Sequence, residues 1–279
     1  MMALRHIFAI PYCYASHPFG RTRSRECMGL KYGLISVAWL CLLATAVHAQ
    51  PYVAGGAQWK PYAFEDENGH LEGISVDIAR RVMKLASLEV TFITYPVNRL
   101  NSMLDRREID VNFADALIWN TPREQAHYVF SKPYSAVSEH LYFLANHPDR
   151  TRPIAEMDHL KIGMIRGYTY ATLEPALASK QLSKLETSQQ DSLIKLLSNG
   201  RVDAIAVVDD IFDTIMRSNH LDTGLFYKGA KLGDAPLVLK LQPEHANWLP
   251  QINNAIDTLR INGEIDRIRN HYLPAHQKH

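Results

Sequence analysis

Apolar and polar residues follow two different periods through the first half of the chain. Short runs rich in Val, Ile, Phe and Thr have the composition of strands. Between them, apolar residues recur at the spacing of a helix, and Ser75 is the expected N-cap of the first helix. The pattern predicts strands at 52–54, 89–94 and 109–113 and helices at 76–85 and 100–104. The expected buried face of the first helix comprises Ile78, Val82 and Leu85. This order is typical of a mostly parallel sheet with flanking helices.

The stretch 59–84 joins an aromatic turn, a polar hairpin and an amphipathic helix into one unit. Pro61 stiffens the turn, so we expect the rings of Trp59 and Tyr62 to be presented outward. The alternative is that this aromatic pair merely closes a core. Gly69 permits the positive φ angle that the polar hairpin needs.

A second α/β unit follows after residue 160. Its predicted elements are strands at 161–165 and 202–208 and helices at 170–177, 193–197, 211–217, 252–260 and 265–272. Extended apolar strands at 139–145 and 236–241 would carry the chain out of the first unit and back. We therefore predict an α/β protein of two lobes joined by two crossover strands. The expected boundaries are 50–140 with 237–279 for lobe 1 and 141–236 for lobe 2.

The N-terminal 1–49 segment is interpreted as a secretory signal peptide. The apolar run 34–47 follows Lys31, and compact residues, Val47 and Ala49, stand at the third and first positions before Gln50, which predicts cleavage after Ala49. A transmembrane anchor is the alternative, but the run is shorter than the roughly 20 apolar residues that a membrane helix needs. Met28 is a candidate for the true start, since it leaves a compact basic region before the apolar run.

Composition narrows the chemistry further. All three cysteines precede the predicted cleavage site, so the mature chain has no disulfide framework, thiol nucleophile or cysteine-bound metal. It carries 25 basic and 28 acidic side chains, and this net charge of −3 makes nucleic acid an unfavourable partner. Sequence motifs for zinc hydrolases, Walker loops, nucleophile elbows and dinucleotide sites are absent. We expect no catalytic residue, metal or cofactor.

Ligands of open α/β sheets bind where the carboxyl ends of strands meet. This rule places the segments 55–62 and 114–123 on one rim. Thr121 is an expected N-cap and Pro122 an expected first helical residue, so this loop leads to a helix N-terminus able to receive an anion.

Five segments, taken in this order, resemble the extracellular solute-binding proteins of family 3, the polar amino-acid receptors of ABC importers. They are 59–79, 104–110, 121–134, 162–169 and 255–273. The resemblance implies the type II periplasmic binding fold, in which two lobes close on a small ligand like a Venus flytrap. It implies a periplasmic monomer whose partners are the small-molecule ligand and the membrane permease of an ABC importer. Its hinges would lie in the crossover strands.

The carboxylate-binding residues implied by this resemblance depart from the family pattern. Relatives that bind α-amino acids use an arginine two or three residues after the Thr-Pro pair, because guanidinium grips a carboxylate bidentately. Here Arg123 follows the proline directly, and Glu124 stands at the usual arginine position. In the second lobe, Arg166 and Thr169 stand where the family contacts that carboxylate, with Tyr168 in place of a small residue.

Acidic candidates for a ligand ammonium group are Asp209, or its neighbour Asp210, and Asp115. Capping of the following helix is the alternative role for Asp209 or Asp210, and a salt bridge or solvation is the alternative for Asp115. Trp119 stands in a loop where relatives have small hydroxyl residues that contact the ligand. Its side chain is either a stacking wall for the ligand or a packed core residue.

The candidate aromatic walls are Trp59, Tyr62, Trp119 and Tyr168. Rings favour apolar or cationic groups while charges orient the ligand, so this combination suits a zwitterionic or cationic organic molecule. Two other functions stay open on the same fold: a ligand-sensing accessory protein for a membrane receptor, and an enzyme like cyclohexadienyl dehydratase. In an enzyme, Asp115, Glu124 or His127 would be the candidate acid or base.

Overall fold

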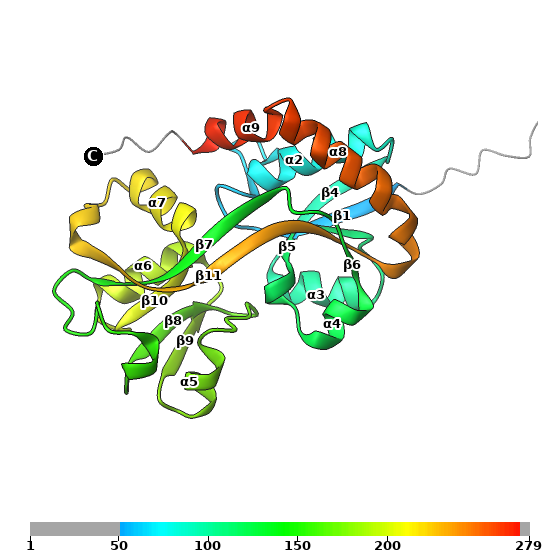
Figure 1. The fold of residues 1–279 in the computed structure, drawn as a ribbon. Coiled ribbons are helices and arrows are strands. Elements are labelled where there is room, and N and C mark those ends of the chain that lie inside the picture. Colours follow the sequence, from blue (N-terminus) through cyan, green and yellow to red (C-terminus); the bar gives the residue numbers. More distant parts are fainter. Residues whose placement is uncertain (1–50, 274–279) are drawn as a thin grey trace, which may run out of the picture. The chain divides into compact units, whose positions relative to one another are not determined.

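The computed structural model describes residues 51–273. The predicted signal peptide, its cleavage after Ala49 and the candidate start at Met28 lie outside the described residues. Within 51–273, no helix is long and apolar enough to cross a membrane. The described strands form one curled nine-stranded sheet and a separate two-stranded hairpin, with helices on the faces of the large sheet (Figure 1).

The first half of the sheet is the parallel unit that the sequence predicts. Strand β1 lies between β4 and β5 and pairs in parallel with both. Helices α2, α8 and α9 pack against one another beside it, so the C-terminal helices return to the first lobe (Figure 1). The elements are β1 Tyr52–Ala57, β2 Phe64–Glu65, β3 Leu71–Glu72, α2 Ile74–Leu85, β4 Val90–Tyr95, α3 Val97–Asp105, β5 Val111–Ala116, α4 Pro122–His127, β6 Val129–Phe130, α8 Leu249–Ile261 and α9 Glu264–Tyr272.

The second half repeats the arrangement with β8 between β9 and β10, all parallel. Strand β9 is not predicted by the sequence pattern, and α5 begins at residue 174, four residues after its predicted start. The elements are β8 Lys161–Ile165, α5 Glu174–Ala178, β9 Ser183–Thr187, α6 Gln190–Ser198, β10 Ala204–Val208 and α7 Asp209–Ser218.

Two long antiparallel strands join the halves through the middle of the sheet. They are β7 Ser135–Leu144 and β11 Phe226–Leu241. Strand β11 pairs with β5 of the first half, and β7 pairs with β10 of the second. Register shifts interrupt the β7–β11 ladder after Lys228 and after Lys231. The predicted α/β class, with two lobes and two crossover strands, is confirmed; the residue boundaries of the lobes stay a prediction.

Helix α2 corrects two local predictions. It begins at Ile74 with Gly73 as N-cap, so Ser75 lies inside the helix, where its hydroxyl accepts a hydrogen bond from Tyr134 Oη at 2.8 Å. Gly73 has a φ of 128°, and a Cβ there would overlap the carbonyl of Tyr62, which is why glycine occupies the cap. Leu85 is 53% exposed, because the buried face of the last turn is formed by Val82, Met83 and the following Ala86.

Candidate ligand-binding site

A cavity of about 220 Å³ lies where the rim of the first lobe meets the turn after β8. It is smaller than the roughly 300–1,000 Å³ of pockets for drug-sized ligands, so it suits a solute of amino-acid size. Aromatic side chains and charged groups share its lining. The residues that matter most are Trp59, Trp119, Tyr168, Asp115, Glu139 and Lys240.

Five of the nine residues proposed from the sequence line this cavity: Trp59, Asp115, Trp119, Tyr168 and Thr169. The other four lie outside its lining: Tyr62, Arg123, Arg166 and Asp209. The structure therefore brings together three of the four predicted rings and one predicted carboxylate. Arg123 lies outside the cavity, and Arg166 lines a neighbouring hollow that shares Trp59 and Tyr168 with it. A direct role of any of these residues in binding stays a prediction.

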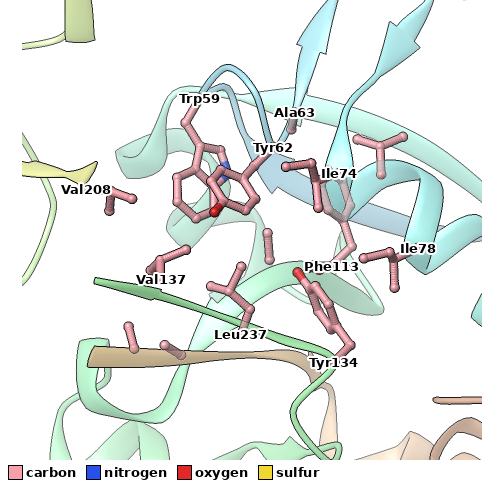
Figure 2. Packing of buried hydrophobic residues seen from close by; sticks show 14 of the residues in the cluster. Trp59, Tyr62, Ala63, Ile74, Ile78, Phe113, Tyr134, Val137, Val208 and Leu237 are labelled. Carbon is pink, nitrogen blue, oxygen red and sulfur yellow. Dashed lines mark hydrogen bonds between the residues drawn. The ribbon is translucent and has the colours of Figure 1, made fainter. Parts of the chain in front are cut away.

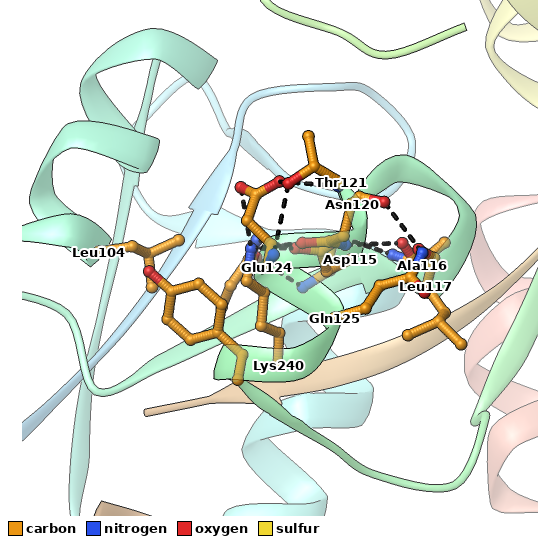
Figure 3. Close-up of polar contacts among 12 residues, drawn as sticks. Leu104, Asp115, Ala116, Leu117, Asn120, Thr121, Glu124, Gln125 and Lys240 are labelled. Carbon is orange, nitrogen blue, oxygen red and sulfur yellow. Dashed lines mark hydrogen bonds and ion pairs between the residues drawn. The ribbon is translucent and has the colours of Figure 1, made fainter. Parts of the chain in front are cut away.

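Lys240 of β11 is the cation of the cavity, and its side chain is 3% exposed. Lys240 Nζ donates to Asn120 Oδ1 at 2.5 Å and lies 3.5 Å from Asp115 Oδ2 (Figure 3). Glu124 Oε1 is 3.9 Å from the same ammonium, which also lies 4.3 Å from the centre of the Tyr128 ring. The neighbouring side chains of the first lobe thus surround this buried charge.

Asp115, at the end of β5, is hydrogen-bonded through both carboxylate oxygens. Its Oδ1 accepts from Asn120 Nδ2 at 2.8 Å and from the backbone N–H of Ala116 at 2.7 Å. Its Oδ2 accepts from Asn112 Nδ2 at 3.0 Å. Burial raises the pKa of Asp115, although Lys240 and the hydrogen bonds act in the opposite direction. Of the two alternatives for Asp115, its geometry is that of a salt-bridged carboxylate.

Helix α4 begins as predicted, with Thr121 as N-cap and Pro122 in the first helical position. Glu124 completes a capping box: its N–H donates to Thr121 Oγ1 at 3.3 Å, and its carboxylate accepts from the Thr121 N–H at 2.8 Å (Figure 3). Burial alone would raise the pKa of Glu124, but the Thr121 hydrogen bonds outweigh it and the pKa lies below its usual value. The anion predicted at this helix N-terminus is therefore the protein's own Glu124. Arg123, one residue earlier, is exposed.

Trp59 and Tyr62 are buried, contrary to the expectation that their rings point outward. Trp59 is 4% exposed and stacks on Tyr62, with ring centres 4.5 Å apart (Figure 2). Trp119 meets Trp59 edge to face, with ring centres 5.9 Å apart. Tyr62 is fully buried behind Trp59 and packs in the core, because the turn folds back onto α2 and β5.

Glu139 of β7 is a buried carboxylate that sequence reasoning missed. It lines the cavity and is 7% exposed. Burial raises its pKa to about 7, with a smaller contribution from the charge of Asp209, while a hydrogen bond with the Trp119 side chain lowers it. Within residues 51–273, no Lys, Arg or His lies within ion-pair distance of it.

The two neighbouring aspartates at the start of α7 point in different directions. Asp209 Oδ1 accepts from Tyr142 Oη at 2.9 Å and lies 2.9 Å from His140 Nδ1. Asp210 Oδ2 accepts from Tyr62 Oη at 2.5 Å. The N-cap residue of α7 is Val208, so neither aspartate is its N-cap. Asp210 thus ties the second lobe to the aromatic turn of the first.

The turn after β8 closes the cavity from the second lobe. Gly167 has a φ of 86°, and a Cβ at this position would overlap the side chain of Asn98 at the start of α3. Glycine therefore lets the turn approach the first lobe closely. Tyr168 and Thr169 follow it into the cavity lining, whereas Arg166 is exposed.

A sequence signal for Glu139 and Lys240 does exist. Each is a charged residue within an apolar crossover strand, and charges are rarely buried unless they are paired or functional. The strands were predicted, but their charged members were not considered as candidates.

The fold and the cavity define a two-lobed solute-binding protein. The chain belongs to the bacterial extracellular solute-binding proteins, family 3, whose family model matches residues 52–275. The histidine-binding periplasmic protein of Salmonella typhimurium is 22% identical over 77% of this chain and 84% of its own length. The arginine-binding periplasmic protein of Mannheimia haemolytica is 24% identical over 88% and 99%. The solved structure of an ancestral arginine-binding protein bound to arginine has a TM-score of 0.66 at 20% identity, over 80% of this chain and 97% of that one.

Proposed function

We propose that the protein captures a small polar organic solute, an amino acid or a related zwitterionic or cationic compound, for an ABC importer. The observation that carries this proposal is the small cavity between the two lobes, which is lined by aromatic rings and by charged groups of both signs. The relatives that bind histidine and arginine support a solute of this size and polarity.

The proposal includes a place and a partner. The chain would be exported, cleaved after Ala49, and act in the periplasm as a single copy that delivers its solute to a membrane permease. Closure of the two lobes by bending of β7 and β11 would trap the solute, since these are the strands that connect them. The described relatives are solute-binding proteins, which supports binding without catalysis.

Mass spectrometry of small molecules released from the natively purified, exported protein tests this function. We expect one released solute per chain, and calorimetry with that solute should give a single site. Incubation with the solute should return it unchanged. Formation of a new product would contradict a pure binding role, and the absence of any bound or binding solute would contradict the proposal as a whole.

A further inference from the structure

Lys240, the cation of the cavity lining, is already paired with groups of the protein itself. The Lys240 ammonium is directed at Asn120, Asp115 and Glu124, at the 2.5, 3.5 and 3.9 Å distances given above. Only the Asn120 contact is a clear hydrogen bond, while the carboxylates of Asp115 and Glu124 lie at ion-pair distances and compensate the single positive charge. Arg123 and Arg166 lie outside the cavity lining. Among the described residues, the cavity lining holds no cationic side chain besides Lys240, whose charge is already paired with the protein's own carboxylates.

Glu139, in contrast to Lys240, has no ion-pair partner in the part of the chain that the structure describes. It lies on the cavity wall and is buried. The charged neighbour that acts on it, Asp209, has the same sign. An unpaired carboxylate in a low-dielectric environment is unfavourable, and a bound cation would remove that cost.

The rings beside Glu139 also favour a cation. Trp119 hydrogen-bonds the carboxylate, and Trp59 and Tyr168 line the same cavity. The negative face of an aromatic ring attracts an ammonium or guanidinium group, most strongly where water is excluded. The carboxylate and the rings thus converge on one kind of chemical group.

We propose that this cavity selects organic cations that carry no carboxylate, with Glu139 as the counter-ion and Trp59, Trp119 and Tyr168 as the walls. The proposal rests on the proposed function and deepens it, because it names the chemical class of the solute. It separates this protein from receptors that hold both ends of an α-amino acid.

Calorimetry with three matched pairs of probes tests the selectivity. Each pair differs by one carboxylate: agmatine and arginine, histamine and histidine, choline and glycine betaine. In the exported, dialysed protein, we expect at least one carboxylate-free member to bind, and to bind more tightly than its partner by roughly tenfold or more. Tighter binding of the carboxylated member, or binding of none of the six, overturns the selectivity proposal.

Substitution of Glu139 tests the counter-ion. Glu139→Gln should weaken binding of the preferred cation by roughly 30-fold or more, because its partner charge is lost. Glu108→Gln is the matched control, since this exposed carboxylate pairs with Arg106 away from the cavity. Glu139→Asp keeps the charge and should bind more tightly than Glu139→Gln. Far-ultraviolet circular dichroism verifies folding of each variant, and unchanged affinity in folded Glu139→Gln overturns the proposal.

These outcomes distinguish a failure of the proposed selectivity from a failure of the proposed function. A carboxylated amino acid recovered by mass spectrometry and bound in calorimetry would overturn the selectivity and leave the transport role standing. Failure to find any solute would instead remove the proposed function, and the selectivity with it.

Discussion

Asp115 and Glu139 are buried carboxylates on the wall of one cavity, yet their surroundings differ. Asp115 has the Lys240 ammonium 3.5 Å away and accepts hydrogen bonds from two asparagine side chains. Glu139 has no ion-pair partner among the described residues, and the nearby charge of Asp209 is of the same sign. Burial thus raises the pKa of both groups, but only at Asp115 do several polar partners act against it.

The difference distinguishes the structural role that we infer for Asp115 from the ligand-binding role that we propose for Glu139. A buried carboxylate whose oxygens are fully used holds its own lobe together and has little capacity for a solute. One that stays unpaired next to a cavity is retained at a cost to stability, and such groups concentrate at functional sites. The proposed roles of Asp115 and Glu139 follow from this contrast.

The largest effect is expected for Lys240→Met, because this substitution removes the cation that pairs with Asp115. Asp115 and Glu124 would then face each other without a counter-ion. The free energy of unfolding should fall by about 3–5 kcal/mol, as for other broken buried ion pairs. Urea denaturation measures it. Lys228→Met is the control: its side chain is 48% exposed, and a loss below about 1 kcal/mol is expected there. If Lys240→Met lowered the free energy of unfolding as little as Lys228→Met does, the ion pair of Asp115 with Lys240 would not stabilise the protein, and Asp115 would be no better paired than Glu139.

The next largest effect is the pH dependence of the free energy of unfolding that Glu139 causes. Its pKa is about 7 in the folded protein against a usual value of 4.5, so the folded state holds the extra proton between these values. Stability from this group is therefore present at pH 4.5 and is lost as pH rises through 7. From pH 5 to 8, the wild type should lose about 2.5 kcal/mol relative to Glu139→Gln. Urea denaturation across this range measures the difference. A gap that does not change with pH would show that Glu139 is as well paired as Asp115.

A smaller loss is expected for Asp115→Asn. Both oxygens of Asp115 face N–H donors. In Asp115→Asn the new amide NH₂ replaces one of these acceptor oxygens and faces a donor of Asn112, Asn120 or Lys240, so at least one hydrogen bond is lost. The free energy of unfolding should fall by about 2 kcal/mol in urea denaturation. Asp257→Asn, at an exposed ion pair with Lys132, is the control and should change it by less than about 1 kcal/mol. If Asp115→Asn left the free energy of unfolding unchanged, the hydrogen bonds of Asp115 would not stabilise the protein, and the two carboxylates would not differ in this respect.

The smallest effect is expected for Arg123→Ala. This guanidinium is the carboxylate ligand expected from the family resemblance, but the side chain is exposed and lies outside the cavity lining. Solute affinity in calorimetry should change by less than about threefold, as for most contacts outside a binding core. A loss comparable to that of Glu139→Gln would bring Arg123 into the site and weaken the case for a carboxylate-free solute.

Much of the fold followed from local pattern. The first parallel unit, both crossover strands and two of the three strands of the second unit were predicted, because strand and helix periods and apolar runs are properties of neighbouring residues. Strand β9 was missed. The start of α4 was predicted for the same reason, since an N-cap and a following proline act within one turn. The cap of α2 was assigned to Ser75 instead of Gly73, because the deciding contact with Tyr62 is made by the folded turn.

The sequence by itself determined the class of protein: a two-lobed α/β receptor of the solute-binding kind, with aromatic residues and carboxylates near one rim. Only the tertiary structure decided how its charges are paired. Consecutive helical residues point about 100° apart, so α7 sends Asp209 toward His140 and Asp210 toward Tyr62. Likewise, the pairing of β11 with β5 brings Lys240 to Asp115, residues far apart in the chain. Pairing over such distances depends on strand register and lobe contacts, which no local pattern contains.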